Sequence, residues 1–184
     1  MVSRRAGQAG AQESSEMIRA SDHKYFLARR AIAPTTLRGN ASREGRREIF
    51  RFLSKLQTPN DPTRFATWLD DQTVWLAKRS AIEWGASRKA LNLFLRDLRH
   101  DSQFGPGLAV LAPELEIPLD SVTMKAIRQN KYLMPDVRKK LSVTTIKGLT
   151  RSLSFSFQEA AKVVAKKRKV DRVDLDVLFW ARSK

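Results

Sequence analysis

At the centre of the chain lies the stretch Ile82-Glu83-Trp84-Gly85-Ala86-Ser87-Arg88-Lys89-Ala90-Leu91. A helix-like run ends at Trp84, and Gly85 can take the positive φ that often ends a helix. A second run begins almost at once, with Ser87 as its predicted N-cap. Its apolar face carries Leu91, Phe94, Leu95 and Leu98 at helical spacing. The pattern predicts two helices joined by a tight turn.

Basic side chains gather at this predicted turn. Free backbone N–H groups at a helix start and the helix dipole both favour a negative charge, so a phosphate oxygen suits the position. The predicted phosphate contacts at the turn are Gly85, Ser87, Arg88 and Lys89, and those further along the chain are Arg128, Lys131 and Lys147.

Two segments of the chain carry a resemblance. Gly85-Ala86-Ser87-Arg88-Lys89-Ala90, followed by Leu119-Asp120-Ser121-Val122, resembles the hairpin and catalytic-aspartate segment of the helix-hairpin-helix DNA glycosylase superfamily, which has the endonuclease III-like fold. The usual Leu-Pro-Gly before the hairpin is absent, and the common Asp-Thr-His reads Asp120-Ser121-Val122. A loop around Gly105-Pro106-Gly107 lengthens the interval between the two segments.

The resemblance implies roles for two residues. In that family the hairpin holds duplex DNA by its backbone, and a lysine placed like Lys89 attacks the sugar in members that also cut the strand. An aspartate placed like Asp120 opens the following helix and acts as the essential carboxylate. The resemblance therefore implies an N-glycosylase, with possible AP-lyase activity through Lys89.

The same residues also have simpler interpretations. Removing a base from DNA requires the nucleotide to leave the stack and positive charge on the sugar to be stabilised, which a carboxylate such as Asp120 can do. A lysine such as Lys89 can form a Schiff base once its amine is neutral. Asp120 is also a natural N-cap, and Lys89 also suits a phosphate contact or a solvated position. These alternatives stay open.

The charge of the chain favours a polyanionic partner. Thirty-five Lys and Arg against nineteen Asp and Glu give a net charge of +16 over 184 residues, and the pI is about 10.8. Duplex DNA is the predicted partner. A membrane surface is the competing polyanion, but no apolar run approaches the length of a spanning helix.

The chain has no cysteine and only two histidines. This composition excludes a disulfide, a thiolate zinc site and the iron–sulfur cluster that some glycosylases carry, so no metal and no cofactor are expected. No secretory signal follows Arg4 and Arg5, and we expect a cytoplasmic, nucleoid-associated protein. The basic run 166–169 resembles a nuclear localisation signal, which makes a nuclear location the weaker alternative.

The fold class predicted from periodicity is all-α, with one compact multi-helix domain over residues 22–184 and a mobile tail over 1–21. Helices are expected to start at Asp22, at Ser42, after Asp61-Pro62, at Asp120, at Pro135, at Ser142, at Ser156 and at Asp174. A break is expected near Asp70-Asp71. No strand pattern of useful length is present.

Three functions follow from these patterns. The first is excision of an altered base from DNA, with Asp120 and Lys89 at the reacting sugar. The second is a non-catalytic protein that binds duplex DNA on the same scaffold. The third is an RNA-binding helical protein. Trp68, Trp75 and Trp84 have the spacing of core residues, although an aromatic ring can also stack on an unpaired base.

Overall fold

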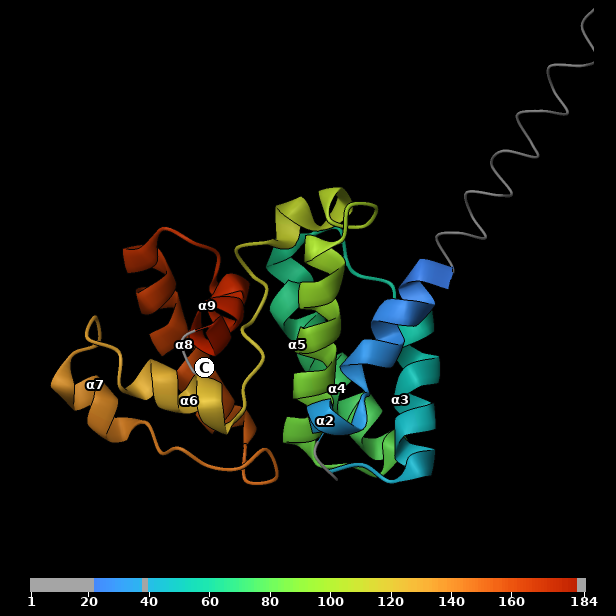
Figure 1. Cartoon of the computed structure of the whole chain (residues 1–184), viewed down its shortest axis with the longest axis horizontal. Coiled ribbons are helices and arrows are strands. Elements are labelled where there is room, and N and C mark those ends of the chain that lie inside the picture. The colour runs from blue at the N-terminus through green and yellow to red at the C-terminus, as the bar shows by residue number, and fades with distance from the viewer. Residues whose placement is uncertain (1–21, 38–39, 182–184) are drawn as a thin grey trace, which may run out of the picture.

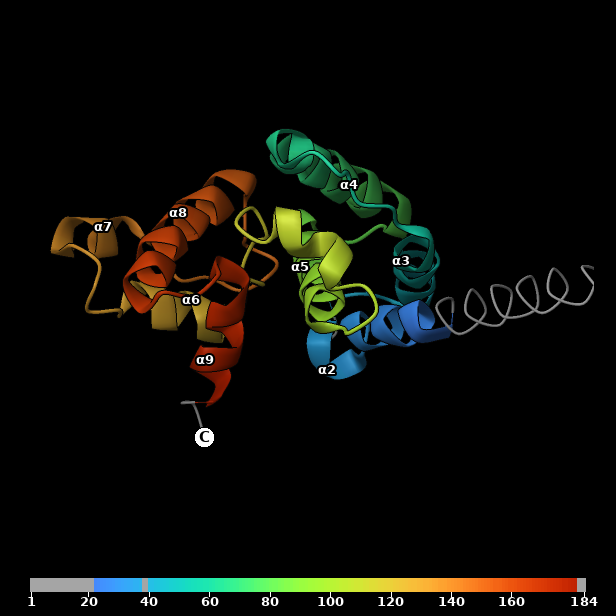
Figure 2. The ribbon, with the colours of Figure 1, turned by 90° about the horizontal axis from the view of Figure 1, so that it is seen from above.

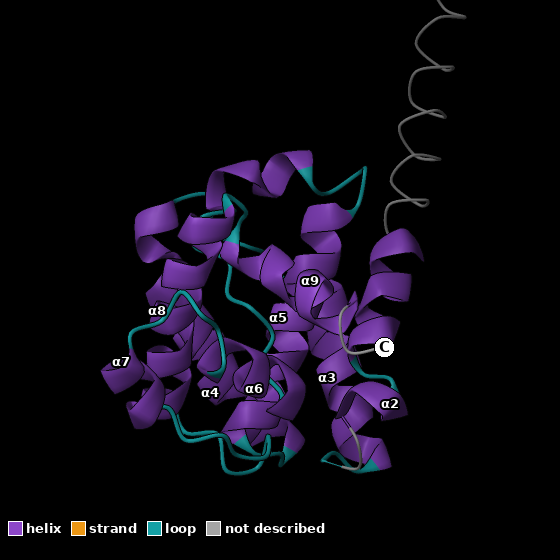
Figure 3. Cartoon of the chain, turned by 60° about the vertical axis from the view of Figure 1, so that its left-hand side comes forward, coloured by secondary structure: helices purple, strands orange, loops and turns teal. Residues whose placement is uncertain are grey.

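The fold is all-α, as the periodicity predicts. A computed structural model describes residues 22–37 and 40–181, and within them the chain forms only helices, turns and loops (Figure 3). The tail predicted over residues 1–21 lies outside the described residues.

The first half of the chain forms an N-terminal lobe. Its elements are a helix over residues 22–31, α2 (Pro34–Leu37), α3 (Arg43–Lys55), η1 (Pro62–Arg64), α4 (Phe65–Ser80) and α5 (Trp84–His100). The apolar face of α5 packs into the core of this lobe, where Leu91, Phe94 and Leu95 are buried. Seen from above, α5 lies on the side of the lobe that faces the rest of the molecule (Figure 2).

The second half of the chain forms a C-terminal lobe with its own apolar cluster. Its elements are α6 (Ser121–Arg128), α7 (Pro135–Lys140), α8 (Arg151–Arg168), η3 (Arg172–Asp174) and α9 (Leu175–Ala181), while η2 (Pro106–Leu111) remains with the first lobe. Met124, Ile127 and Phe157 are fully buried there. Figure 1 shows the two lobes side by side.

An extended segment, residues 115–120, connects the two lobes and runs between them (Figure 1). Leu115 is buried in the first cluster and Ile117 in the second. The side-chain amide of Gln158 donates to the carbonyl of Ile117 at 2.9 Å and accepts from its N–H at 3.2 Å. These bonds satisfy the backbone groups of a buried segment that has no sheet partner.

Several helix starts lie where the sequence predicts them. Ser42 caps α3 by accepting from the N–H of Gly45 at 3.0 Å, and Asp61 caps η1, which begins with Pro62 and continues into α4. Asp120 caps α6, and Pro135 begins α7. In each case a short polar acceptor or a proline marks the boundary locally.

Other local predictions are wrong. The turn between α4 and α5 spans residues 81–83, and Ala81 takes the left-handed conformation there, with φ 51°. Gly85 lies inside the first turn of α5, and Ser87 is not its N-cap. The helix α4 is unbroken at Asp70-Asp71.

The region before α8 also differs from the prediction. Residues 141–145 form an irregular loop and a turn follows them, so no helix starts at Ser142. The helix α8 begins at Arg151, capped by the hydroxyl of Thr150, so Ser156 lies within it.

Candidate functional site

Lys89 lies where three elements meet. It projects from the second turn of α5, and its side chain is 7% exposed. The Nζ group donates to a carboxylate oxygen of Asp120 at 3.2 Å and to the backbone carbonyl of Thr36, in α2, at 3.0 Å. The two residues that the sequence singled out as catalytic are therefore in direct contact.

Asp120 performs two tasks at once. Its Oδ1 accepts from the backbone N–H groups of Val122 at 3.0 Å and Thr123 at 2.9 Å, which caps α6. The Thr123 hydroxyl in turn accepts from the N–H of Asp120 at 2.8 Å, completing a capping box. The other oxygen, Oδ2, faces Lys89. The cap fixes the carboxylate, so its orientation toward the amine is set before any ligand binds.

The Lys89–Asp120 pair lies at the wall of a hollow between the lobes. This hollow, the inter-lobe cavity, has a volume of about 480 Å³ and is lined from α2, α5, the extended segment and α9. Its apolar lining includes Leu93, Pro118 and Trp180. A second hollow of about 290 Å³ also contains Lys89 and Asp120 in its lining. The pair is therefore buried yet bordered on two sides by space that a ligand can enter.

A second ion pair lines the same cavity. Arg96 lies two helical turns after Lys89 on the same face of α5, and its guanidinium binds Asp176 of α9. Burial raises the pKa of Asp176; the positive charge of Arg96 opposes this rise, and the negative charge of Asp120 adds to it. The raised pKa of Asp176 therefore reflects its burial first and the neighbouring charges second.

The residues predicted to hold phosphate at the turn are not at the surface. Gly85 and Ser87 are buried, and a Cβ at Gly85 would lie 2.2 Å from the carbonyl oxygen of Ile146. This close approach of two backbones explains the glycine better than a turn does. The prediction that Gly85 and Ser87 contact phosphate is wrong, because neither is open to solvent.

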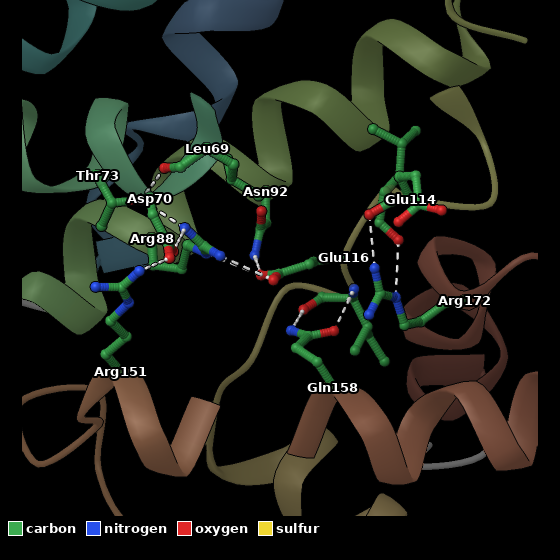
Figure 4. Close-up of polar contacts among 12 residues, drawn as sticks. Leu69, Asp70, Thr73, Arg88, Asn92, Glu114, Glu116, Arg151, Gln158 and Arg172 are labelled. Carbon is green, nitrogen blue, oxygen red and sulfur yellow. Dashed lines mark hydrogen bonds and ion pairs between the residues drawn. The ribbon is translucent and has the colours of Figure 1, made fainter. Parts of the chain in front are cut away.

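Arg88 is also withdrawn from the surface, and its donors are occupied (Figure 4). Its guanidinium binds both oxygens of Glu116 at 2.8 Å and contacts Asp70 at 2.8 Å and Thr73 at 3.0 Å. Burial opposes the charge of Glu116, but the hydrogen bonds and charge of Arg88 outweigh it and hold the pKa of Glu116 below its ordinary value. Arg88 therefore connects α5 to the extended segment, and its prediction as a phosphate contact is wrong.

Arg128, Lys131 and Lys147, in contrast, are exposed on the C-terminal lobe. Lys147 lines the smaller hollow beside Lys89 and Asp120. These three residues remain available for a phosphate, which is the role that the sequence predicts for them.

Sequence reasoning missed Arg96, Asp176 and Trp180 as parts of the cavity. Only Arg96 had a signal, its helical spacing from Lys89. The tryptophans weighed as stacking platforms lie elsewhere: Trp75 is 47% exposed and stacks on Phe52, while Trp68 and Trp84 pack against the two apolar clusters. None of these three lines the inter-lobe cavity.

The described residues hold no group of three or more His, Asp or Glu side chains arranged to bind a metal. None of the helices described has the length and apolar composition needed to cross a bilayer. Comparison of the chain with protein-family models, curated proteins and solved structures gives no significant match.

Proposed function

We propose that this chain binds DNA and excises an altered base, with Lys89 and Asp120 acting at the sugar. One observation supports the proposal above the others: a lysine and an aspartate, 31 positions apart, form an ion pair at the wall of an inter-lobe cavity. The cavity also offers an aromatic side chain, Trp180, and apolar walls that suit the faces of a base. The net charge of +16 suits the phosphates that surround it.

The contact between Lys89 and Asp120 allows a base-excision reaction through a covalent intermediate. Asp120 takes a proton from the Lys89 ammonium group, and the lone pair of Nζ then bonds to C1′ of the deoxyribose. The C1′–N bond breaks, and its electron pair leaves with the base, which takes up a proton from solvent. Nζ then loses a second proton to solvent, and its lone pair opens the C1′–O4′ bond while Asp120 returns its proton to O4′. The product is an imine between Nζ and C1′ that carries one proton, with O4′ as a hydroxyl group. If water attacks instead, Asp120 stabilises the positive charge on the sugar.

Base release from lesion-bearing duplexes tests this function. Asp120→Asn keeps a good N-cap for α6 but removes the negative charge beside Lys89, so we expect base release to fall by a factor of at least about 100 while the fold persists. Lys89→Ala should abolish borohydride trapping on the same duplexes. Lys78→Ala, which removes an exposed lysine of α4 that lines neither hollow beside the ion pair, should change neither quantity.

If no lesion-bearing duplex releases a base with the unmodified chain, the enzymatic function is wrong. If base release occurs but Lys89→Ala still forms a trapped adduct, the role of Lys89 is wrong and that of Asp120 stands.

A second function is a non-catalytic DNA-binding protein on the same scaffold. The contacts of Lys89 favour this function. Its amine donates both to the backbone carbonyl of Thr36 and to Asp120, as expected of a lysine in a structural ion pair. This function predicts that Asp120→Asn leaves DNA affinity unchanged or improves it, with no base release. Competition between duplex DNA and structured RNA at fixed salt distinguishes both functions from RNA binding.

A further inference from the structure

The C-terminal lobe carries a one-sided charge. Residues 121–151 contain eight Lys and Arg and a single acidic residue, Asp136. The basic ones are Lys125, Arg128, Lys131, Arg138, Lys139, Lys140, Lys147 and Arg151. All are exposed except Arg138, which is partly buried. Nearly half of the net charge of the chain is therefore concentrated on α6, α7 and the loop that follows them.

Most of these charges are not neutralised within the molecule. In the described part of the chain Lys125, Lys131 and Lys139 form no salt bridge, and Arg128 donates only to the backbone carbonyl of Arg138, at 3.4 Å. The N-terminal lobe differs, because Arg51 and Arg79 both pair with Glu48 there. Like charges held close together without counterions favour an external polyanion.

Three hollows adjoin one another along this face and together define a path, since neighbouring hollows share lining residues. One of about 640 Å³ is lined by Lys125, Arg128, Arg138 and Lys139 and contains no acidic side chain. It shares Lys125 and Gln129 with the next hollow, of about 870 Å³, which shares Ser121 with the hollow beside Lys89 and Asp120. The path thus leads from the hollow between α6 and α7, along α6, to the ion pair between the lobes.

We propose that a DNA strand follows this path, with its phosphates against Lys125, Arg128 and Lys139, and reaches the inter-lobe cavity past Lys147. The proposal rests on the proposed function for what happens at the end of the path, but the binding itself does not require catalysis. It places the DNA contacts on the helices after Asp120 rather than at the start of α5, where Gly85, Ser87 and Arg88 are buried. A membrane, the other extended polyanion, would not use a path of hollows that ends at a buried ion pair.

A double charge removal tests the path. Arg128→Gln with Lys139→Gln should weaken binding to duplex DNA, whatever its sequence, roughly tenfold to a hundredfold at 0.1 M salt. The slope of log affinity against log salt should become shallower by roughly two, one for each phosphate that the variant no longer neutralises. The matched control, Arg47→Gln with Lys78→Gln, removes one Arg and one Lys from exposed positions on α3 and α4 and should change the slope little.

The outcomes separate this inference from the proposed function. Equal weakening of DNA binding in both double variants would overturn the path, since only total charge would then matter. Binding to anionic lipid vesicles, without binding to DNA at the same ionic strength, would also overturn it. A path-specific weakening of DNA binding without base release from any duplex would uphold the path and reject the enzyme.

The direction of the path can be tested by crosslinking. Because the chain contains no cysteine, a single substitution introduces a unique thiol. Gln129→Cys places this thiol where two of the hollows meet. A photo-crosslinker attached to it should link to the DNA backbone on only one side of a lesion. Gln57→Cys, exposed on the N-terminal lobe, should give no such adduct. Crosslinks from Gln57→Cys alone would contradict the path.

Discussion

The requirement for glycine at position 85 comes from a distant part of the chain. The backbone of Gly85 is helical, and a Cβ there would lie 2.2 Å from the carbonyl oxygen of Ile146 and 2.8 Å from the Cβ of Leu149. Gly85→Ala should therefore lower the free energy of unfolding by about 1–3 kcal/mol, because the loop before α8 must move away. Denaturant unfolding followed by circular dichroism measures this change.

Gly107 provides the matched control at the residue scale. Apart from its chain neighbours and its own helix backbone, no heavy atom lies within 4 Å of the position that its Cβ would occupy. Gly107→Ala should leave the free energy of unfolding unchanged or raise it slightly, since alanine restricts the unfolded chain. If both substitutions cost the same, the close approach between Gly85 and the loop is not what selects glycine.

At the scale of elements, the turn between α4 and α5 decides how the two long helices pack. Ala81 ends α4 in the left-handed region, with φ 51° and ψ 41°, a conformation that disfavours any residue with a Cβ. Ala81→Gly should raise the free energy of unfolding by about 0.5 kcal/mol, because the relief of this strain exceeds the added entropy of the unfolded chain. Thermal and denaturant unfolding curves give the value.

Ala77, one turn earlier within α4, is the control for the direction of the stability change. Here Ala77→Gly should lower the free energy of unfolding by about 1 kcal/mol, the ordinary cost of glycine in a helix interior. A decrease in stability of similar size in Ala81→Gly would show that Ala81 is not left-handed in solution.

At the scale of the whole molecule, a polar network joins the lobes (Figure 4). Arg88 of α5 binds Glu116 of the extended segment and Asp70 of α4, and Asp70 also pairs with Arg151 of α8. Arg172, near the C-terminus, donates to the carbonyl groups of Glu114 at 2.6 Å and Leu115 at 3.0 Å. The lobes therefore hold the segment that leads to Asp120 from both sides.

The charge of Glu116 makes this network sensitive to acid. Its ordinary pKa is 4.5. Burial alone would raise the pKa, but the hydrogen bonds and charge of Arg88 outweigh burial and hold the pKa below 4.5. A carboxyl group with a lowered pKa stabilises the fold above its ordinary pKa, and this stabilisation disappears as the pH falls through the lowered value. Glu116→Gln should therefore cost about 3 kcal/mol at pH 7, where Arg88 is left without its buried partner, and less below pH 4.5.

Unfolding free energies measured between pH 3 and pH 7 test this prediction. Glu44→Gln, at an exposed position in the first turn of α3, should run parallel to the unmodified chain over this range. An equal cost for Glu116→Gln at both ends of the range would mean that its charge does not stabilise the network.

Signals confined to a few residues were enough to predict the all-α class and many of the helix starts. Ser42, Asp61 and Asp120 each provide an acceptor next to an apolar periodic run, and such caps act within one turn of a helix. That Lys89 and Asp120 lie near one another was also expected, although from the resemblance rather than from any local rule. Where signals compete locally, as at Ala81 and Gly85, the sequence predicted the wrong turn.

Only the tertiary structure decided which charges are buried and which are exposed. Arg88 and Lys89 are adjacent basic residues in the sequence, yet one joins the lobes and the other borders the cavity. Arg96, Asp176 and Trp180 join them there because α5 and α9 face one another across the extended segment. The physical reason is range: capping and periodicity act within a few residues, whereas burial of a charge depends on partners from distant parts of the chain.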